Sequence, residues 1–508
     1  MDTKLIAALR KVLSRETGQS VELIETHLSW VLLAPVYAYK LKKPVRLPFV
    51  DFSSVQARKH FCEEELRLNR RFAPSIYLDV VPVRGPRKAP RLDGGNGSEA
   101  IDHVVRMRRF SQSSLLRNLL VSGGLEPAWL DGLARRLAEL HANAPASSSP
   151  GWGSPQRIVR STADVLASLQ AKREDPRHGA LRVWLEVQGA ALSSTWSDRQ
   201  RGGSIRDCHG DLHTGNVALI DGELVPFDCI EFDPGLRWID VMSDVAFLTM
   251  DLKAHGRPDL AFRFLDGWLQ RSGDHAGLRV LPFYEVYRAL VRAMAAGLSQ
   301  PSPEPLTDYL ACAAQWVSPM RDRARLMIAH GLSGSGKSTL AAQLLRAAGA
   351  IRIRSDVERK RLFGLGPLES STALGIDIYT EQATNDTFDS LLHRAREALL
   401  AGYPVIVDAA FLRVHERRRF QALAADLGVP FSILDCQASP ATLRQRVVAR
   451  AASGTDASEA GVEVLERQLA THQPLESDER VVTIQVSTQG PVNIESLEAR
   501  WRAARPFR

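Results

Sequence analysis

Hydrophobic and polar positions follow three successive patterns along the chain. The first 110 residues combine short runs, in which alternate positions are apolar, with one stretch of helical spacing. A long middle part, to about residue 317, repeats apolar residues mainly at helical spacing. From residue 323 onward, short apolar runs alternate with helical stretches, and this order predicts a parallel sheet with right-handed crossovers. We therefore expect two domains, residues 1–318 and 324–508, with a boundary near 318–323.

The first pattern predicts strands over 28–33, 36–42, 80–83 and 104–110, and a helix over 51–69. The second predicts a helix over 130–141 and two helices within 162–198. The third predicts strands over 325–330, 351–354, 405–407, 431–434 and 481–486, and helices over 340–347, 380–400 and 440–451. Period-2 alternation in the second strand places Ala38, Lys40 and Lys42 on one face.

Residues 331–339 read Gly-Leu-Ser-Gly-Ser-Gly-Lys-Ser-Thr and fit the pattern G-x-x-x-x-G-K-[ST] in full. The pattern lies between a predicted strand and a predicted helix, which is the context of a phosphate-binding loop. Glycines let backbone N–H groups point at phosphate oxygens, and the helix N-terminus adds its positive dipole end. We expect ATP here, with Lys337 on the β/γ-phosphates and the Ser338 hydroxyl on Mg²⁺. The predicted nucleotide-binding residues are Gly331, Ser333, Gly334, Ser335, Gly336, Lys337, Ser338 and Thr339.

Four further charged residues are candidates for this C-terminal site. Asp356 follows the strand 351–354, where it either binds an acceptor hydroxyl or caps a helix. Asp408 ends an apolar strand and is either a second carboxylate for Mg²⁺ or a turn residue. Arg446 and Arg450 are four residues apart on one helix face, where they either close over phosphates or face solvent.

A second informative stretch begins with His209-Gly210-Asp211-Leu212-His213-Thr214-Gly215-Asn216. Asp221-Gly222 predicts a two-residue hairpin loop, so Asn216 should face Phe227 on the returning strand. Strict pleating would then aim Asp228 to the opposite face, and we expect a bulge at Pro226 to correct this. An amide and a carboxylate brought together suit a Mg²⁺–phosphate site, and Asp211 could accept a proton from an attacking hydroxyl. His209 and His213 lack a third ligand and suit bracing of the loop better than metal binding.

This stretch resembles the catalytic segment of the aminoglycoside phosphotransferase and kinase-like family, with its H-G-D-x-H-x-x-N pattern. The resemblance extends loosely over residues 25–300 and implies an α+β, two-lobed, protein-kinase-like N-terminal domain. It implies Asp211 as catalytic base and Asn216 and Asp228 as metal ligands. It also implies Lys40 on the α/β-phosphates, Glu65 as the helix partner of Lys40, Met107 in the nucleotide-binding connection, and Asp240 as a brace of the catalytic loop.

The sequence departs from the family pattern in two respects. No glycine lies between Thr26 and Lys42, so the segment that would cover the phosphates is not glycine-rich. Lys42 shares a face with Lys40 and is an alternative phosphate lysine, while Glu63 and Glu64 compete with Glu65 as its partner. Alternatively, Lys40 and Glu65 are a surface lysine and part of a solvated acidic helix.

The C-terminal half resembles small P-loop kinases of the gluconate-kinase, zeta-toxin and polynucleotide-kinase type. That resemblance rests on the phosphate loop, Ser355-Asp356 and Asp408, and implies an α/β P-loop domain with a parallel sheet. The order of the two halves resembles a bacterial class in which an aminoglycoside-phosphotransferase-like domain is fused to an ATP-binding P-loop domain.

Composition narrows the remaining possibilities. Over 508 residues, a hydrophobic content of 44% and a charged content of 24% are typical of a soluble globular protein. The net charge of +7 suits an anionic ligand such as ATP, but also an Arg-rich solvated surface. The sequence has no nucleic-acid-binding pattern and no apolar run long enough to cross a membrane. We therefore expect neither nucleic acid nor a membrane as a partner. Five scattered cysteines without C-x-x-C favour reduced thiols in the cytoplasm.

We therefore expect a bifunctional ATP- and Mg²⁺-dependent phosphotransferase. Each half would move a γ-phosphoryl group to a hydroxyl of a small molecule. The alternative is one catalytic P-loop half with a kinase-like N-terminal module that senses nucleotide without turnover.

Overall fold

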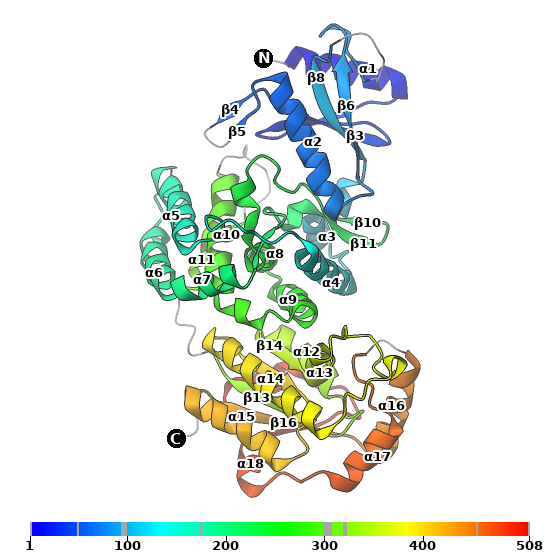
Figure 1. Ribbon diagram of the computed structural model, residues 1–508, viewed down its shortest axis with the longest axis vertical. Helices are drawn as coiled ribbons and strands as arrows, with labels where there is room; N and C mark the ends of the chain where they lie inside the picture. Colours follow the sequence, from blue (N-terminus) through cyan, green and yellow to red (C-terminus); the bar gives the residue numbers. More distant parts are fainter. Residues whose placement is uncertain are drawn as a thin grey trace. The chain divides into compact units, whose positions relative to one another are not determined.

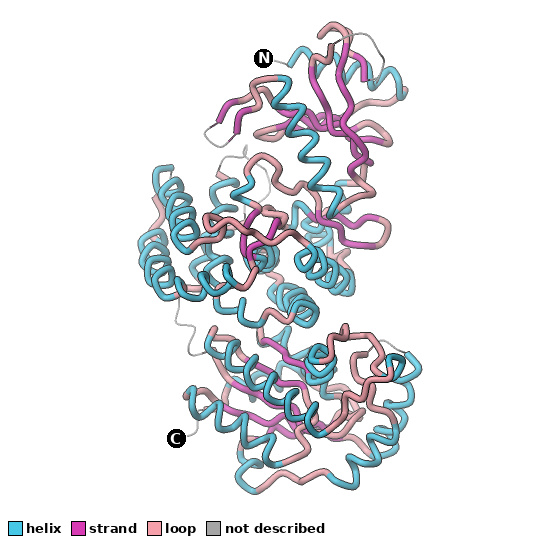
Figure 2. The backbone as a smooth tube through the Cα atoms, viewed as in Figure 1, coloured by secondary structure: helices cyan, strands magenta, loops and turns pink. Residues whose placement is uncertain are grey.

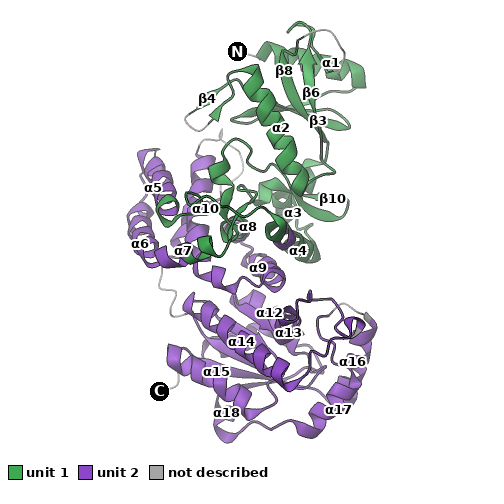
Figure 3. Ribbon diagram, in the orientation of Figure 1, with its two compact units in different colours: residues 1–136, 140–157, 198–248 green, residues 137–139, 158–197, 249–508 purple. Residues whose placement is uncertain are grey.

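The computed structural model describes residues 3–47, 50–92, 99–172, 174–297, 307–317, 323–453 and 456–505 (Figure 1). These residues form two compact units (Figure 3). Unit 1 comprises residues 1–136, 140–157 and 198–248, and unit 2 comprises 137–139, 158–197 and 249–508. Most of the expected domain boundary, residues 318–322, lies outside the described residues.

Unit 1 contains a six-stranded antiparallel sheet in the order β1-β2-β3-β8-β6-β7. Its strands are β1 (Glu22–Glu25), β2 (Ser29–Leu33), β3 (Tyr37–Lys42), β6 (Tyr77–Arg84), β7 (Arg91–Leu92) and β8 (Asp102–Arg108). The four strands predicted in this region are β2, β3, β6 and β8, with bounds shifted by a few residues. Helices α1 (Thr3–Thr17) and α2 (Val55–Phe72) pack against this sheet.

Alternation along β3 separates two hydrophobic cores on the two faces of the sheet. Tyr39 and Leu41 belong to a core with the buried side chains of α1. Ala38 belongs to the other core, which includes Cys62 of α2. Lys40 and Lys42 alternate in phase with Ala38 and share its face, as the spacing predicted, and this face is the one that α2 covers.

The rest of unit 1 consists of short paired strands and helical segments. The hairpin of β10 (Val217–Ile220) and β11 (Glu223–Pro226) has the predicted register, with Ile220 opposite Glu223. The other pairs are β4 (Arg46–Leu47) with β5 (Val50–Asp51) and β9 (Ile205–Asp207) with β12 (Trp238–Asp240). Helix α3 is Leu116–Ser122, and α4 (Pro127–Asn143), α7 (Ser193–Arg201) and α8 (Val241–Ala254) carry residues of both units.

Unit 2 contains a five-stranded, wholly parallel sheet in the order β14-β15-β13-β16-β17. Its strands are β13 (Leu326–His330), β14 (Ile351–Arg354), β15 (Val405–Asp408), β16 (Phe431–Gln437) and β17 (Thr483–Ser487). Figure 2 shows these strands in magenta behind helices α14 and α15. The predicted parallel sheet is thus confirmed, and all five strands lie where the apolar runs indicated.

Most helices of the described chain lie in unit 2. Around the parallel sheet they are α12 (Lys337–Ala348), α13 (Ser355–Leu362), α14 (Glu381–Leu400), α15 (Val414–Leu427), α16 (Pro440–Ser453), α17 (Val462–Thr471), α18 (Ser477–Val481) and α19 (Ile494–Arg502). The others are α6 (Arg177–Ala191), α9 (Pro258–Ser272), α10 (Leu281–Ala296), α11 (Tyr309–Ala314) and, apart from its first three residues in unit 1, α5 (Pro155–Lys172). In the described part of the chain, none of the helices has both the length and the apolar character of a membrane span.

The expectation of two helices within 162–198 was wrong, because α5, α6 and α7 all overlap this stretch. Helix α6 ends at Ala191, and α7 begins at Ser193 after a single intervening residue. Three hydroxyl residues in a row, at 193–195, are typical of a helix start, since such side chains compete for backbone hydrogen bonds inside a helix.

Candidate functional site

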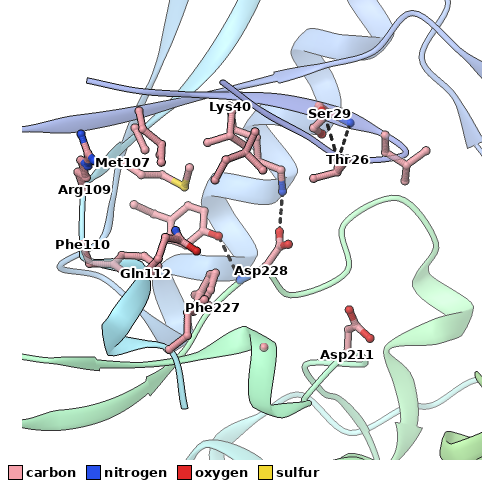
Figure 4. Close-up of a pocket in the computed structure, with 18 of the residues that line it drawn as sticks. Thr26, Ser29, Lys40, Met107, Arg109, Phe110, Gln112, Asp211, Phe227 and Asp228 are labelled. Atoms are coloured by element: carbon pink, nitrogen blue, oxygen red, sulfur yellow. Dashed lines mark hydrogen bonds and ion pairs between the residues drawn. The ribbon is translucent and has the colours of Figure 1, made fainter. Parts of the chain in front are cut away.

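A cavity of about 530 Å³ lies in unit 1 beside the sheet and the β10–β11 hairpin. Figure 4 shows Met107, Phe110 and Phe227 on one side of it, and Lys40, Asp228 and Asp211 on the other. The structure therefore brings these predicted residues together, although they lie up to 188 positions apart, as Lys40 and Asp228 do. The cavity thus has apolar side chains on one side, with Arg109 beside them, and charged side chains on the other.

Glu65 connects the two lysines of β3 from the buried side of α2. Its side chain is 0% exposed, with one oxygen 2.8 Å from Lys40 Nζ and the other 2.7 Å from Lys42 Nζ. Lys40 also donates to Asp228 Oδ1 at 2.5 Å. Burial alone would lower the pKa of Lys40, but the carboxylates of Asp228 and Glu65 raise it well above its usual value. Burial would raise the pKa of Glu65, yet Lys40 and Lys42 lower it.

The geometry distinguishes between the alternatives that the sequence left open. Lys40 lines the cavity, whereas Lys42 is buried and pairs with Glu65 and Glu231. Glu63 is exposed near Lys59, and Glu64 pairs with Arg67 on the helix surface, so only Glu65 faces the lysines. Lys40 and Glu65 thus form the pair at the cavity, and Lys42 serves as an internal counter-charge.

Asp228 reaches the cavity through an unusual backbone conformation. The expected bulge at Pro226 was wrong, because Pro226 pairs with Val217 in unbroken register and Phe227 N–H donates to Asn216 O at 2.9 Å. Asp228 instead has φ 63°, in the left-handed region, which ends the strict alternation of the strand. Local strain of this kind persists only where surrounding contacts hold it.

Two buried polar side chains supply those contacts. The Asp228 N–H donates to the Tyr77 hydroxyl at 3.1 Å, and the Cys229 N–H donates to Asn69 Oδ1 at 2.8 Å. Asn69 belongs to α2 and also donates from Nδ2 to the Glu65 carbonyl at 3.0 Å. Helix α2 therefore carries Glu65, which pairs with the lysines, and also holds the backbone next to Asp228 through Asn69. The sequence patterns did not single out Tyr77 or Asn69, because neither belongs to a local motif.

Asp211 is held by the loop that carries it. Asn216 Nδ2 donates to Asp211 Oδ2 at 2.9 Å and to the Asp211 carbonyl at 3.0 Å. His213 accepts from the Gly215 N–H at Nδ1, and its Nε2 lies 3.6 Å from Asp211 Oδ2. The predicted pair of Asp211 and Asn216 is thus in direct contact, on a loop that ends in the hairpin.

The loop is braced by Asp244 and not by Asp240, which corrects the expectation. Asp244 is fully buried and accepts from the N–H groups of His209 and Gly210 at 2.9 and 2.8 Å. Asp240 instead forms a bidentate pair with Arg199. The two carboxylates lie four residues apart in one segment, and only the three-dimensional fold shows which of them faces the loop.

His209 contributes to the same bracing from inside the loop. Its Nε2 lies 2.9 Å from the Phe227 carbonyl, and its Nδ1 accepts from the Asp211 N–H at 3.3 Å. Burial lowers the pKa of His209, which favours the neutral ring that these two bonds require. The ring therefore links the loop to the hairpin strand, in agreement with the bracing role that we expected.

The second site lies in unit 2, around a cavity of about 940 Å³ at the ends of β13, β14 and β15. Residues 331–336 connect β13 to α12, with Gly331, Gly334 and Gly336 at φ 138°, 81° and 86°. A Cβ at Gly334 would lie 2.7 Å from the Leu443 carbonyl, so both space and conformation require glycine there. The loop thus has the tight curl that its sequence predicted.

Of the polar side chains after this loop, Ser338 contacts the end of β15, whereas Lys337 binds the loop itself. Lys337 Nζ donates to the Leu332 carbonyl at 2.8 Å, and burial lowers the pKa of Lys337. Ser338 Oγ donates to Asp408 Oδ1 at 3.0 Å. Asp356 lines the cavity from the first turn of α13, whose cap position is Arg354, so Asp356 is not the N-cap.

Arg446 and Arg450 also line this cavity from α16. Arg446 Nη1 donates to the Gly334 carbonyl at 3.3 Å, and its Nη2 to the Thr488 carbonyl at 2.6 Å. Arg450 Nη2 donates to the Ala460 carbonyl at 2.7 Å. Both arginines therefore have backbone partners in this arrangement, and neither is a plain solvated side chain.

Comparison with known proteins assigns each half of the chain to a family model. Residues 54–284 match the model of the phosphotransferase enzyme family, and residues 326–475 match an AAA domain. Proteins of Mycobacterium tuberculosis and Mycobacterium bovis, themselves uncharacterized, are 32% identical over 451 residues, covering 86% of this chain and 88% of theirs.

The chain belongs to the same family as these mycobacterial proteins. It is a phosphotransferase enzyme, and we name its matched parts the phosphotransferase segment (54–284) and the AAA segment (326–475). Its fold is the expected one, a kinase-like α+β N-terminal domain followed by an α/β P-loop domain.

Solved structures are similar to parts of this chain. A gluconokinase from Sinorhizobium meliloti is 20% identical over 35% of this chain and 90% of its own, with a TM-score of 0.26. A choline/ethanolamine kinase family protein from Mesorhizobium loti is 12% identical over 62% of this chain and 92% of its own, with a TM-score of 0.38.

We expect the substitution Glu65→Gln to destabilise unit 1 by about 3 kcal/mol, because the buried Lys42 ammonium group and the Lys40 ammonium group at the cavity would lose their shared carboxylate. Glu64→Gln is the matched control, since Glu64 lies on the same helix but pairs with Arg67 at the surface. Amide hydrogen exchange of α2 and β3 measures the difference. Equal exchange in the two variants would contradict the central role of Glu65.

The effect of Glu65 should depend on pH with a defined sign. Folding lowers the pKa of Glu65 from 4.5, so its stabilisation is complete above that pH and is lost as the pH falls toward the folded-state pKa. The gap in urea stability between wild type and Glu65→Gln should therefore narrow below about pH 4.5. A gap that widens in acid would show that Glu65 is not the ionised partner.

Proposed function

We propose that the chain is a bifunctional phosphotransferase, in which each half transfers the γ-phosphoryl group of ATP to a hydroxyl of a small molecule. The observation that carries this proposal is that the structure brings together two separate sets of polar side chains, one in each half of the chain. One set is Lys40, Glu65 and Asp228 beside Asp211, and the other is Lys337, Ser338 and Asp408. Each set lines its own cavity, apart from the buried Glu65 that supports Lys40.

In the N-terminal half, Lys40 is proposed to bind the α/β-phosphates, because its ammonium group lies on the cavity and is held by Glu65. Met107 and Phe227 form the apolar side of the cavity, which suits the face of a purine base. Asp211 is proposed to accept the proton of the acceptor hydroxyl, and Asn216 orients it by donating to Oδ2.

The donor set of this half fits Mg²⁺, which prefers oxygen ligands. The Asp228 carboxylate is 42% exposed, and Asn216 uses its amide nitrogen on Asp211, which leaves its amide oxygen for a cation. Asp228 and Asn216 are therefore the proposed metal ligands. When bound, Mg²⁺ would neutralise phosphate charge.

In the C-terminal half, the loop at 331–339 is proposed to bind the phosphates through its backbone N–H groups, with Lys337 on the β/γ-phosphates. Ser338 and Asp408 are the proposed Mg²⁺ ligands, and their direct contact at 3.0 Å supports the assignment. Asp356 is proposed to bind the acceptor hydroxyl. Arg446 and Arg450 are proposed to approach the transferred group as the site closes, which requires them to leave their present backbone partners.

A second candidate function is favoured by the turn between β1 and β2. Residues 26–29 line the cavity without any glycine, so this turn lacks the residues that let a glycine-rich loop approach phosphates closely. The N-terminal half would then bind ATP without turnover and regulate the C-terminal half.

We expect Asp211→Ala and Lys337→Ala to abolish two different acceptor-dependent activities. Loss of a general base lowers the rate by about 10²–10⁴-fold, and loss of a phosphate-binding charge by a similar factor. The measurement is Mg²⁺-dependent ATP turnover against a pooled library of hydroxyl metabolites. An unchanged profile in Asp211→Ala, with all activity lost in Lys337→Ala, would establish the regulatory alternative.

Lys40 and Lys42 should respond differently to the same substitution. We expect Lys40→Met to remove nucleotide binding at the N-terminal site with little loss of stability, because Lys40 lies on the cavity. Lys42→Met should instead destabilise the fold, because it leaves Glu65 and Glu231 buried without Lys42. Calorimetric titration with an ATP analogue measures nucleotide binding, and thermal unfolding measures stability. The opposite result would mean that Lys42 binds the nucleotide and that Lys40 stabilises the fold.

A further inference from the structure

An arginine of the AAA segment is held by a helix of the phosphotransferase segment, and both lie within unit 2. Arg352 of β14 donates from Nη2 to Asp266 Oδ2 of α9 at 2.8 Å and from Nε to Asp266 Oδ1 at 3.3 Å. The side chains are only 9% and 11% exposed. A bidentate pair of this kind fixes the plane of the guanidinium.

The remaining nitrogen of Arg352 points at the proposed Mg²⁺ end of the C-terminal site. Its Nη1 donates to the Ser338 carbonyl at 3.2 Å and lies 3.9 Å from Asp408 Oδ2. Asp408 Oδ1 accepts from Ser338, whereas Oδ2 is buried and accepts no hydrogen bond from any described residue. The distance of 3.9 Å is too long for a hydrogen bond, so Arg352 stops just short of this oxygen.

A second arginine near Asp408 is restrained in the same way. Arg354 Nε lies 3.6 Å from Asp408 Oδ2, and its Nη2 donates to both oxygens of Asp456. Each arginine that faces Asp408 thus has a carboxylate of its own. A buried carboxylate oxygen without a hydrogen-bond donor is costly, and this arrangement keeps two adjacent donors away from it.

We propose that Asp266 is a positioning residue of the C-terminal site, which holds Arg352 away from Asp408 and so keeps Asp408 Oδ2 available for the divalent cation. The inference rests on the proposed function of that site. Without the Asp266 charge, Arg352 turns its guanidinium to Asp408 and forms the charge-assisted pair that the present geometry prevents. The guanidinium and the cation then compete for one oxygen.

Helix α9 is well placed to transmit a change to this site. Its C-terminal end is also held by the AAA segment, since Arg361 Nη2 donates to the Gln270 carbonyl at 2.6 Å and Arg394 donates to the Gly273 carbonyl. Asp266 lies one turn before Gln270, so a displacement of α9 moves the carboxylate that restrains Arg352. The Mg²⁺ affinity of one segment therefore depends on the position of a helix from the other.

The test measures binding of a non-hydrolysable ATP analogue by calorimetry over a range of Mg²⁺ concentrations, in the full chain. The C-terminal component is the binding that Lys337→Ala removes. We expect Asp266→Asn to raise the Mg²⁺ concentration for half-maximal binding at this component by about 10- to 100-fold, the usual cost of changing a residue that acts behind a metal ligand. The second substitution Arg352→Met should return the Asp266→Asn chain to the wild-type value, because the competing guanidinium is gone.

Two variants guard against a purely structural explanation. Asp259→Asn is the matched control on the same helix, since Asp259 forms an ion pair with Arg257 near the start of α9. Asp266→Ser removes the same charge with a smaller side chain, in case Asp266→Asn folds poorly. A structural role predicts that Arg352→Met adds to the damage, and only the proposed role predicts rescue.

An unchanged Mg²⁺ dependence in both Asp266 variants, or a double variant no better than Asp266→Asn, would overturn the inference alone. Wild-type chain without any Lys337-dependent binding would overturn the proposed function, and the inference with it.

Discussion

The contact of Glu65 with two lysines is the interaction on which the N-terminal site depends. A carboxylate with no exposed surface is stable only when its charge is matched, and Lys42 supplies that match from inside the sheet. The second oxygen of Glu65 then remains directed at Lys40, which lies at the cavity. The buried pair of Glu65 and Lys42 fixes helix α2 against strand β3. Lys40, which lies nearer the cavity, is thereby held in a defined position.

Unit 2 uses the same principle with the signs reversed. There the group at the cavity is a carboxylate, Asp408, and the surrounding charges are arginines, each restrained by an acid of its own. An unpaired arginine beside a carboxylate would compete with a metal cation for that carboxylate, whereas an arginine that is already paired with another acid would not. In both halves, therefore, the charged residue at the cavity lies beside charged residues that are themselves paired.

How far the sequence predicted these sites depends on how local each signal is. The loop at 331–339 and the Asp221-Gly222 hairpin are local, because their backbone geometry follows from glycine and turn residues, and both were placed correctly. Asp244 could not be chosen over Asp240 from their spacing, since the choice depends on which side chain a distant loop meets. Asn69, Tyr77 and Arg352 were missed for the same reason: their partners lie on other elements.

The backbone conformation of Asp228 shows why the alternation rule for strands fails at this site. Alternation along the hairpin predicted the wrong face for this side chain, and a bulge would have cost the hairpin a hydrogen bond. The fold instead keeps the ladder intact to Phe227 and places Asp228 itself in a left-handed conformation. That strain is offset by two buried acceptors, the Tyr77 hydroxyl for the Asp228 N–H and Asn69 Oδ1 for the Cys229 N–H. Helix α2, which carries Asn69 and Glu65 one turn apart, therefore sets the position of Lys40 and Asp228 together, so these two charges cannot move independently.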